Sequence, residues 1–239
     1  MPLVKLENVS KIYELENSQV KALDDVSLSI ERGSFVSVIG KSGAGKTTLL
    51  RVINRLEKPD TGNILFESVK RTGTVFQEPR LIRTKTVENN ILLALRHEKD
   101  RELKKKLAKE TIEMLGLAHF SNAYPFQLSG GMAQRVSLGR ALCRKPELLL
   151  MDEPFGSLDA ITRGRLQGEL SSIFAENRIT VIFVTHDVTE AILLGTRILV
   201  MNDGKITDDL KVPQCEKNEN SRVFIELKQH LYKSINNKE

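Results

Sequence analysis

The residues most clearly able to do chemistry are 40–47, Gly-Lys-Ser-Gly-Ala-Gly-Lys-Thr. A glycine, four residues, and then Gly-Lys-Thr form the phosphate-loop pattern. Glycines let the backbone turn tightly and bring its N–H groups close to phosphate oxygens. Lys46 is expected to reach the β- and γ-phosphates, and the Thr47 hydroxyl to ligate Mg²⁺. The other predicted nucleotide contacts are Gly40, Lys41, Ser42, Gly43, Ala44, Gly45 and Thr48.

The flanks of this loop support the same interpretation. The apolar run 35–39 precedes it, and residues 48–53 follow with helical spacing. This is the strand–loop–helix context that the motif requires, and the start of the helix adds the positive end of its dipole. The alternative, a glycine-rich turn without a ligand, is disfavoured by the Gly-Lys-Thr ending together with both flanks.

A second candidate group stands at the end of residues 147–153, Glu-Leu-Leu-Leu-Met-Asp-Glu. Continuous apolar residues are typical of a central parallel strand covered on both faces. In open α/β sheets, ligands gather at the carboxyl ends of such strands. Asp152 is therefore predicted to hold Mg²⁺, and Glu153 to act as the general base toward the attacking water. The alternative is a pair of solvated carboxylates.

Gln77 and His186 also follow predicted strands, residues 73–76 and 179–185. An exposed glutamine usually has no special role, and a lone histidine is usually structural. In a phosphate-loop protein, however, the Gln77 amide could contact Mg²⁺ or the attacking water. His186 could donate a hydrogen bond to the γ-phosphate.

Residues 128–135, Leu-Ser-Gly-Gly-Met-Ala-Gln-Arg, predict another helix start suited to phosphate. Ser129 is a good N-cap, and Gly130 and Gly131 allow a close backbone approach to a ligand. One nucleotide needs only one phosphate loop. This second helix start is therefore predicted to complete a site on another copy of the chain.

The rest of the chain predicts further strands at 3–9, 20–30 and 63–67, with a polar loop at 14–18. Amphipathic helices are expected from residue 86 and at 100–115, and Leu103, Leu107, Thr111 and Met114 lie on one face of the second. A helix at 159–176, a short helix at 188–194, a hairpin at 197–210 and a helix near 221–235 complete the prediction.

Composition excludes several classes of protein. The chain has 239 residues, 40% of them hydrophobic, which is enough for a core. No apolar run approaches the roughly 18 residues of a membrane span, and the N-terminus lacks signal-peptide features. The two cysteines have no metal or disulfide spacing, so a reducing cytosol is expected. The net charge of +5 permits binding to nucleic acid or an anionic membrane, and it is also common in ordinary soluble proteins.

Taken in order, these motifs resemble the ATP-binding subunits of ABC transporters. The Leu-Ser-Gly-Gly element is particularly specific, because other phosphate-loop proteins lack it. The resemblance covers about residues 3–210. The residues within the motifs are most similar to those of bacterial importers of nitrate, sulfonate or taurine type. The residues that carry it are Tyr13, Gly40–Thr47, Gln77, Leu128–Met132, Leu148–Glu153, Ser157–Asp159 and His186.

The resemblance implies an α/β fold: a P-loop NTPase, with an ABC-type ATPase domain at residues 1–212. This domain would contain a mixed central sheet, an antiparallel β subdomain and a helical subdomain at about 81–145, followed by a tail at 213–239. Two copies would bind ATP and Mg²⁺ head to tail. Tyr13 would stack on adenine, and Asp159 would contact the opposite copy.

The same resemblance implies a place at the cytoplasmic face of the membrane. Integral permease subunits would be direct partners and a solute-binding protein an indirect one, with no nucleic acid partner. A soluble ABC ATPase acting on ribosomes or DNA is the alternative, but such relatives usually carry two ATP-binding halves or a long coiled coil. A GTPase is disfavoured because the nearest match to its Asn-Lys-x-Asp motif, residues 202–205, fits a hairpin turn better.

Overall fold

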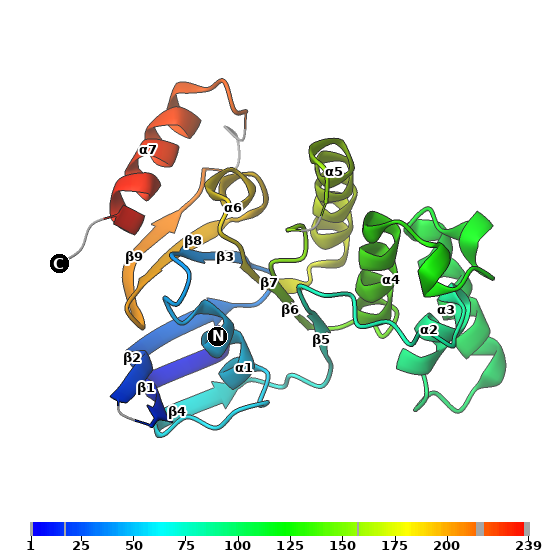
Figure 1. Cartoon of the computed structure of the whole chain (residues 1–239), viewed down its shortest axis with the longest axis horizontal. Helices are drawn as coiled ribbons and strands as arrows, with labels where there is room; N and C mark the ends of the chain where they lie inside the picture. The colour runs from blue at the N-terminus through cyan, green and yellow to red at the C-terminus, as the bar shows by residue number, and fades with distance from the viewer. Residues whose placement is uncertain (1, 17, 157, 214–217, 237–239) are drawn as a thin grey trace. The chain divides into compact units, whose positions relative to one another are not determined.

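The computed structural model describes residues 2–16, 18–156, 158–213 and 218–236. Ser157, part of one motif quoted above, lies outside these ranges. The chain divides into two compact units. Figure 1 labels its helices and strands. The first unit combines Met1–Val69 with Phe174–Glu239, and the second is Lys70–Ile173.

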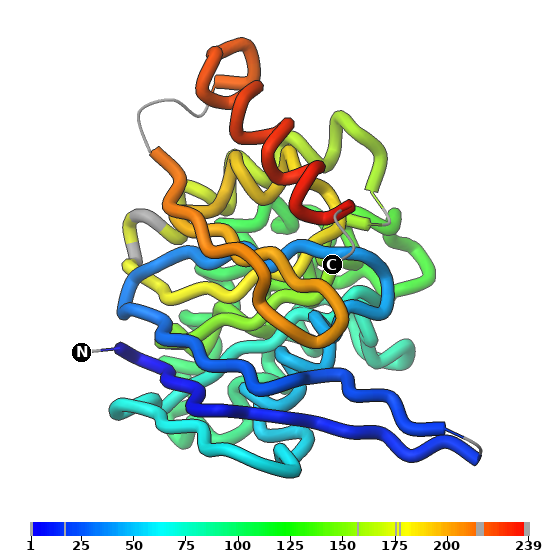
Figure 2. The backbone as a smooth tube through the Cα atoms, turned by 90° about the vertical axis from the view of Figure 1, so that its left-hand side faces the viewer, coloured from blue at the N-terminus to red at the C-terminus, as the bar shows by residue number. Residues whose placement is uncertain are grey.

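An antiparallel sheet forms one part of the first unit. Strand β1 (Pro2–Leu15) lies between β2 (Ser18–Glu31) and β4 (Thr61–Phe66) and pairs antiparallel with both. Figure 2 shows β1 and β2 as two long neighbouring strands, with β4 on the other side of β1. Leu3, Leu6 and Val9 of β1 are buried in the core, so the sheet has one covered face.

The β1–β2 hairpin is longer than the sequence predicted. The prediction of strands at 3–9 and 20–30 with a loop at 14–18 was wrong in extent, because Leu15 still pairs with Ser18. Shifts in register between Leu6 and Ile12 interrupt the alternation of apolar and polar residues on which the prediction depended. Beyond this irregularity backbone pairing continues although the side chains reach solvent, and Leu15 is 57% exposed.

A second group of strands in the first unit has the order β7-β3-β8-β9. Strands β3 (Phe35–Gly40), β7 (Thr180–Val184) and β8 (Arg197–Asn202) are parallel, and β9 (Lys205–Lys211) returns antiparallel to β8. Every residue of β3 and β7 is buried. This confirms the prediction that the continuous apolar runs are interior strands and that 197–210 is a hairpin.

Three helices complete the first unit: α1 (Lys46–Ile53), α6 (Val188–Leu194) and α7 (Arg222–Asn236). Phe224 and Leu231 of α7 pack with Val188 of α6 and Ile198 of β8 in one apolar cluster. Figure 1 shows α7 beside the strand pair β8–β9. The predicted helix near 221–235 is thereby confirmed, and its apolar face is anchored on the sheet.

The second unit contains a pair of parallel strands and most of the helices. Strands β5 and β6 pair in register from Thr72↔Leu148 to Val75↔Met151. The side chain of Thr86 caps α2, and that of Asp100 caps α3. The helix α5 begins in this unit, and its last residues belong to the first. The elements are β5 (Thr72–Val75), α2 (Val87–Ala94), α3 (Arg101–Met114), α4 (Gly130–Leu142), β6 (Leu148–Asp152) and α5 (Ala160–Asn177), with short 3₁₀ helices at Ala118–Phe120 and Pro125–Gln127.

The buried face of α3 differs from the predicted one. Leu103 and Met114 are each 41% exposed, whereas Ala108, Thr111 and Ile112 are buried. Next to this face lies Gly139 of α4, where an added Cβ would lie 2.8 Å from Leu115 Cδ1 and 3.3 Å from Thr111 Cγ2. Helix α3 turns Ala108, Thr111 and Ile112 inward and leaves Leu103 and Met114 at the surface.

In the described part of the chain, none of the helices is both long enough and apolar enough to span a lipid bilayer.

Substituting Leu231, which is fully buried against α6 and β8, should weaken the attachment of α7. For Leu231→Ala we expect the free energy of unfolding to fall by about 2–5 kcal/mol, because a buried leucine is replaced by a cavity. Urea denaturation measures this change. Tyr232→Ala is the matched control, since its side chain is half exposed, and it should cost less than about 1 kcal/mol. Equal losses in the two variants would contradict the proposed anchoring of α7.

Candidate nucleotide site

The predicted phosphate loop follows β3 directly and leads into α1. The backbone passes so close to its neighbours here that side chains are excluded at two positions. A Cβ on Gly40 would lie 2.2 Å from the carbonyl oxygen of Met201, and a Cβ on Gly45 would lie 2.1 Å from that of Ala22. Gly45 also has φ +97° and serves as the N-cap of α1. Only glycine fits these two positions of the loop.

Lys46 lies inside this loop. Its side chain is buried, and Nζ donates hydrogen bonds to the carbonyl oxygens of Gly40 (2.9 Å) and Lys41 (2.8 Å). A buried ammonium needs such acceptors, because desolvation without partners is costly. Phosphate oxygens are stronger acceptors for the same group. The loop therefore fits a nucleotide phosphate, because its backbone carbonyl groups already hold the charged Lys46 ammonium in place.

His186 lies level with the start of the phosphate loop. In the parallel pairing of β3 with β7, Val38 faces Val184, and Gly40 and His186 follow two residues later on their strands. His186 is exposed, and the next residue, Asp187, caps α6 by accepting from the N–H groups of Thr189 and Glu190. The structure thus places the predicted γ-phosphate ligand at the same sheet edge as the loop.

Tyr13 lies on β1, where it pairs with Val20. Its hydroxyl donates a hydrogen bond to the carboxylate of Glu57, which also accepts from Arg51 Nη1 at 3.2 Å. Arg51 belongs to α1, the helix that the phosphate loop begins. The predicted adenine platform is therefore connected to α1 through a single carboxylate. Sequence reasoning missed Glu57, and no pattern in its neighbourhood would have indicated this role.

Gln77 and Glu153 meet in the second unit. Val75 of β5 pairs with Met151 of β6, and Gln77 and Glu153 each follow two positions later on their strands. The amide Nε2 of Gln77 donates to Glu153 Oε2 at 3.4 Å. Glu153 has φ +43°, a left-handed conformation that is unfavourable for a residue with a side chain. Such strain is typical of functional positions, where the surrounding structure holds the residue in place.

Besides Gln77, the predicted magnesium ligands are Thr47 in the first unit and Asp152 in the second. Thr47 is in the first turn of α1, and Asp152 is the last residue of β6. Among the described residues, no group of three or more His, Cys, Asp or Glu side chains gathers as a metal cage. Proteins commonly hold Mg²⁺ through one or two side-chain oxygens while phosphate and water supply the others. Thr47, Asp152 and Gln77 stay the residues predicted to hold it.

The second predicted phosphate-binding element is the start of α4. Ser129 Oγ accepts from the N–H of Met132 at 3.3 Å, which confirms the N-cap. A Cβ on Gly131 would lie 2.8 Å from Thr162 of α5, so this glycine is also required for packing. Gly130 is exposed.

Asp159 lies close to this helix start, because Leu158 and Thr162 both approach Gly131. Its carboxylate accepts from the N–H of Thr162 at 2.9 Å. This N–H, followed by the Thr162 hydroxyl, holds the pKa of Asp159 below its usual range. The structure therefore brings the two groups predicted to face a second copy together at one surface, and it gives Asp159 a local bond at the start of α5.

Comparison with known proteins identifies the family. The family model described as "ABC transporter" matches residues 23–156. An aliphatic sulfonates import ATP-binding protein of Bacillus cereus is 42% identical over 95% of this chain and 94% of its own length. A spermidine/putrescine import ATP-binding protein of Lawsonia intracellularis is 41% identical over 93% of this chain and 62% of its own.

Among solved structures, a dimeric ATP-binding cassette in a post-hydrolysis state, bound to ADP and Pi, superposes with a TM-score of 0.80. It is 35% identical, and the match covers 88% of this chain and 99% of that one. The P-loop α/β fold with mixed and antiparallel sheets is confirmed by this neighbour. The chain belongs to the ABC transporter family and is an ATPase that uses ATP and Mg²⁺.

Proposed function

We propose that this chain is the ATP-hydrolysing subunit of an importer, and that two copies close on two ATP molecules to drive the uptake of a small solute. The observation that carries the proposal is the presence of two phosphate-type elements on one chain. One is the loop around the buried Lys46, and the other is the capped start of α4 at Ser129. A single nucleotide uses one such loop, so the second element serves a nucleotide held by another copy.

In this proposal the loop Gly40–Thr48 holds the ATP phosphates. Lys46 exchanges its two carbonyl acceptors for phosphate oxygens, so its buried charge keeps hydrogen-bond partners throughout. Tyr13 stacks on adenine, and its hydroxyl bond to Glu57 restrains the ring. Adenine stacking on an aromatic side chain needs no base-specific hydrogen bonds.

Hydrolysis is assigned to Glu153, with Gln77 and His186 beside the reacting groups. Glu153 accepts a proton from the attacking water as it approaches the γ-phosphate. Gln77, which donates to one Glu153 oxygen, orients the carboxylate or the water. His186 donates to the γ-phosphate. Mg²⁺ at Thr47 and Asp152 would neutralise charge that develops on the phosphates.

The second copy contributes Ser129, Gly130 and Gly131 to each nucleotide, and Asp159 at the contact between copies. The helix start offers backbone N–H groups and a positive dipole end to the γ-phosphate. The dimeric state of the neighbouring cassette structure supports this arrangement. Closure is favoured by ATP and reversed by hydrolysis, which supplies the cycle that a transporter needs.

Transport requires partners. Integral permease subunits would take up the motion of the dimer at the cytoplasmic face of the membrane, and a solute-binding protein would deliver the cargo. The sulfonate importer among the relatives supports a small anion of nitrate, sulfonate or taurine type as cargo. The polyamine importer has nearly the same identity, so the cargo must be established by the partners themselves.

Mild-detergent extraction of native membranes, followed by capture of this chain and mass spectrometry, tests the importer assignment. We expect a multi-span membrane protein to be recovered with it. Recovery of ribosomal or DNA-repair proteins without a membrane subunit would contradict the importer and support the soluble alternative. The importer names of both relatives support the first outcome.

Lys46→Ala should weaken ATP binding by about 10- to 100-fold, because a hydrogen bond between charged partners contributes roughly 1.5–3 kcal/mol. Equilibrium titration with a fluorescent ATP analogue measures the change. Lys58→Ala is the matched control, since Lys58 is an exposed lysine outside the loop and its loss should leave affinity unchanged. Equal affinity in Lys46→Ala and the wild type would remove Lys46 from the phosphate site.

Glu153→Gln should leave ATP binding intact, lower kcat by about 100-fold or more, and trap an ATP-bound dimer. The amide keeps the size and one acceptor oxygen of the side chain but cannot take a proton. Steady-state ATPase assays and light scattering with Mg-ATP provide the two measurements. Wild-type hydrolysis would show that Glu153 is not the base. A variant that stays monomeric at high concentration would contradict the shared site.

A further inference from the structure

Helix α4 is attached at two points to the short segment that carries Gln77. Gln134 Nε2 donates to the carbonyl oxygen of Phe76 at 3.2 Å. One and a half turns further along, Arg140 Nη1 donates to the carbonyl oxygen of Arg80 at 2.7 Å. The two accepting carbonyls stand on either side of Gln77. The backbone that presents the Gln77 amide to Glu153 is thus held from both ends by one helix.

Gln134 is an unfavourable choice for stability at its position. Its side chain is 1% exposed, and its Oε1 is a buried acceptor without a hydrogen-bond partner among the described residues. Such an unpaired acceptor destabilises the folded state, and an apolar side chain of the same length would avoid this cost. An apolar replacement could not make the bond from its amide nitrogen to Phe76.

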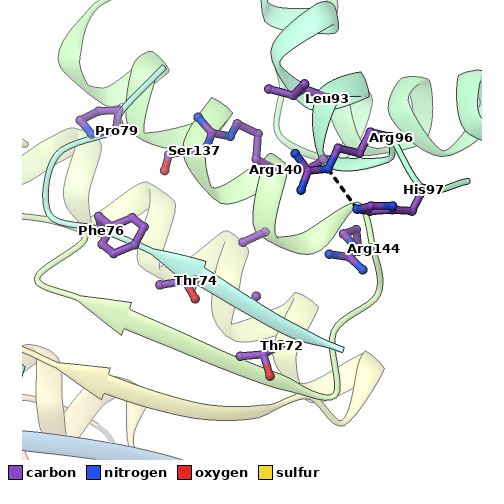
Figure 3. A pocket seen from close by; sticks show the side chains of 13 residues that line it. Thr72, Thr74, Phe76, Pro79, Leu93, Arg96, His97, Ser137, Arg140 and Arg144 are labelled. Carbon is purple, nitrogen blue, oxygen red and sulfur yellow. Dashed lines mark hydrogen bonds between the residues drawn. The ribbon is translucent and has the colours of Figure 1, made fainter. Parts of the chain in front are cut away.

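The attached segment borders a cavity of about 270 Å³. Residues of β5, α2 and α4 line most of it, and Phe76 and Pro79 of the segment contribute to the lining (Figure 3). Arg80 has φ +47°, and its guanidinium stacks over the Phe76 ring at 4.2 Å. The two hydrogen bonds from α4 therefore help to position the segment after β5, at Phe76 and at Arg80.

The same helix begins at Ser129–Gly131, the element assigned to the nucleotide of a second copy. Gln134 follows this start by about one turn, on the rigid body of the helix. If α4 shifts when Ser129–Gly131 binds a phosphate, the hydrogen bonds from α4 would therefore move the backbone at Phe76 and Arg80 with it. This movement would shift Gln77 relative to Glu153.

We propose that Gln134 and Arg140 are positioning residues that transmit contact with the second copy's nucleotide to the Gln77–Glu153 pair of their own copy. This inference rests on the proposed function. It assigns to two side chains the task of making hydrolysis depend on closure of the dimer. Neither side chain touches the nucleotide, so both act on the rate of the reaction and not on the affinity for ATP.

The test uses Gln134→Met and Arg140→Met in the full chain. Each should lower kcat roughly three- to tenfold, the worth of one hydrogen bond, while KM for ATP stays unchanged. Arg144→Met is the matched control, because Arg144 lines the same cavity but makes no hydrogen bond to residues 76–80 in the described part of the chain. Its kcat should equal that of the wild type. Arg140→Lys, which keeps a donor, should recover part of the loss.

A double variant separates positioning from a general loss of structure. If Gln134 acts through Gln77, adding Gln134→Met to Gln77→Ala should lower kcat no further. The melting temperature of the single variant Gln134→Met should be equal to or above that of the wild type. Multiplying losses, or a fall in kcat accompanied by a fall in melting temperature, would overturn the inference. If Gln77→Ala itself hydrolyses ATP normally, the failure lies in the proposed role of Gln77. If Gln77→Ala is slow and Gln134→Met is not, the inference alone fails.

Discussion

The parallel pairing of strands is the constraint on which the candidate site depends. In the first unit, β3 pairs with β7 and β8, so Gly40 and His186 leave the sheet at one edge. In the second unit, β5 and β6 pair in the same way, and Gln77 meets Glu153. Because parallel strands run in one direction, the polar residues that follow them lie at the same edge of the sheet, although they are far apart in sequence. The hydrogen-bond register decides which residues are neighbours.

Two residues of the candidate site carry an energetic cost. Lys46 is a buried cation, and Glu153 adopts a left-handed backbone. Each cost is offset by local contacts. Lys46 is held by the two carbonyl groups of its own loop, and one Glu153 oxygen accepts from Gln77. A site built in this way is organised before its substrate arrives, which reduces the ordering that binding requires.

Much of this arrangement could be predicted from the sequence, because it follows from local patterns. Continuous apolar runs indicated the buried strands β3, β6 and β7, and the Ser129 cap indicated where α4 begins. The extent of the β1–β2 hairpin could not be predicted, because irregular register hides the alternation and pairing extends into solvent. The buried face of α3 was predicted at Thr111 but not at Ala108 and Ile112, since that face depends on packing against other helices, such as α4 at Gly139.

The contacts that sequence reasoning missed share one property: each joins a side chain to a partner fixed only by the tertiary structure. Glu57 accepts from Tyr13, a residue distant in sequence, and nothing near either position indicates the bond. Gln134 is different, because a polar residue there interrupts the buried stripe that continues through Leu138 and Ala141. A buried glutamine on the apolar face of a helix is a signal that the sequence contains. The signal says that a polar partner exists, and only the packing of α4 against the Gln77 segment says that the partner is the Phe76 carbonyl. At Gln134, therefore, a buried polar side chain indicates a contact that no motif predicts.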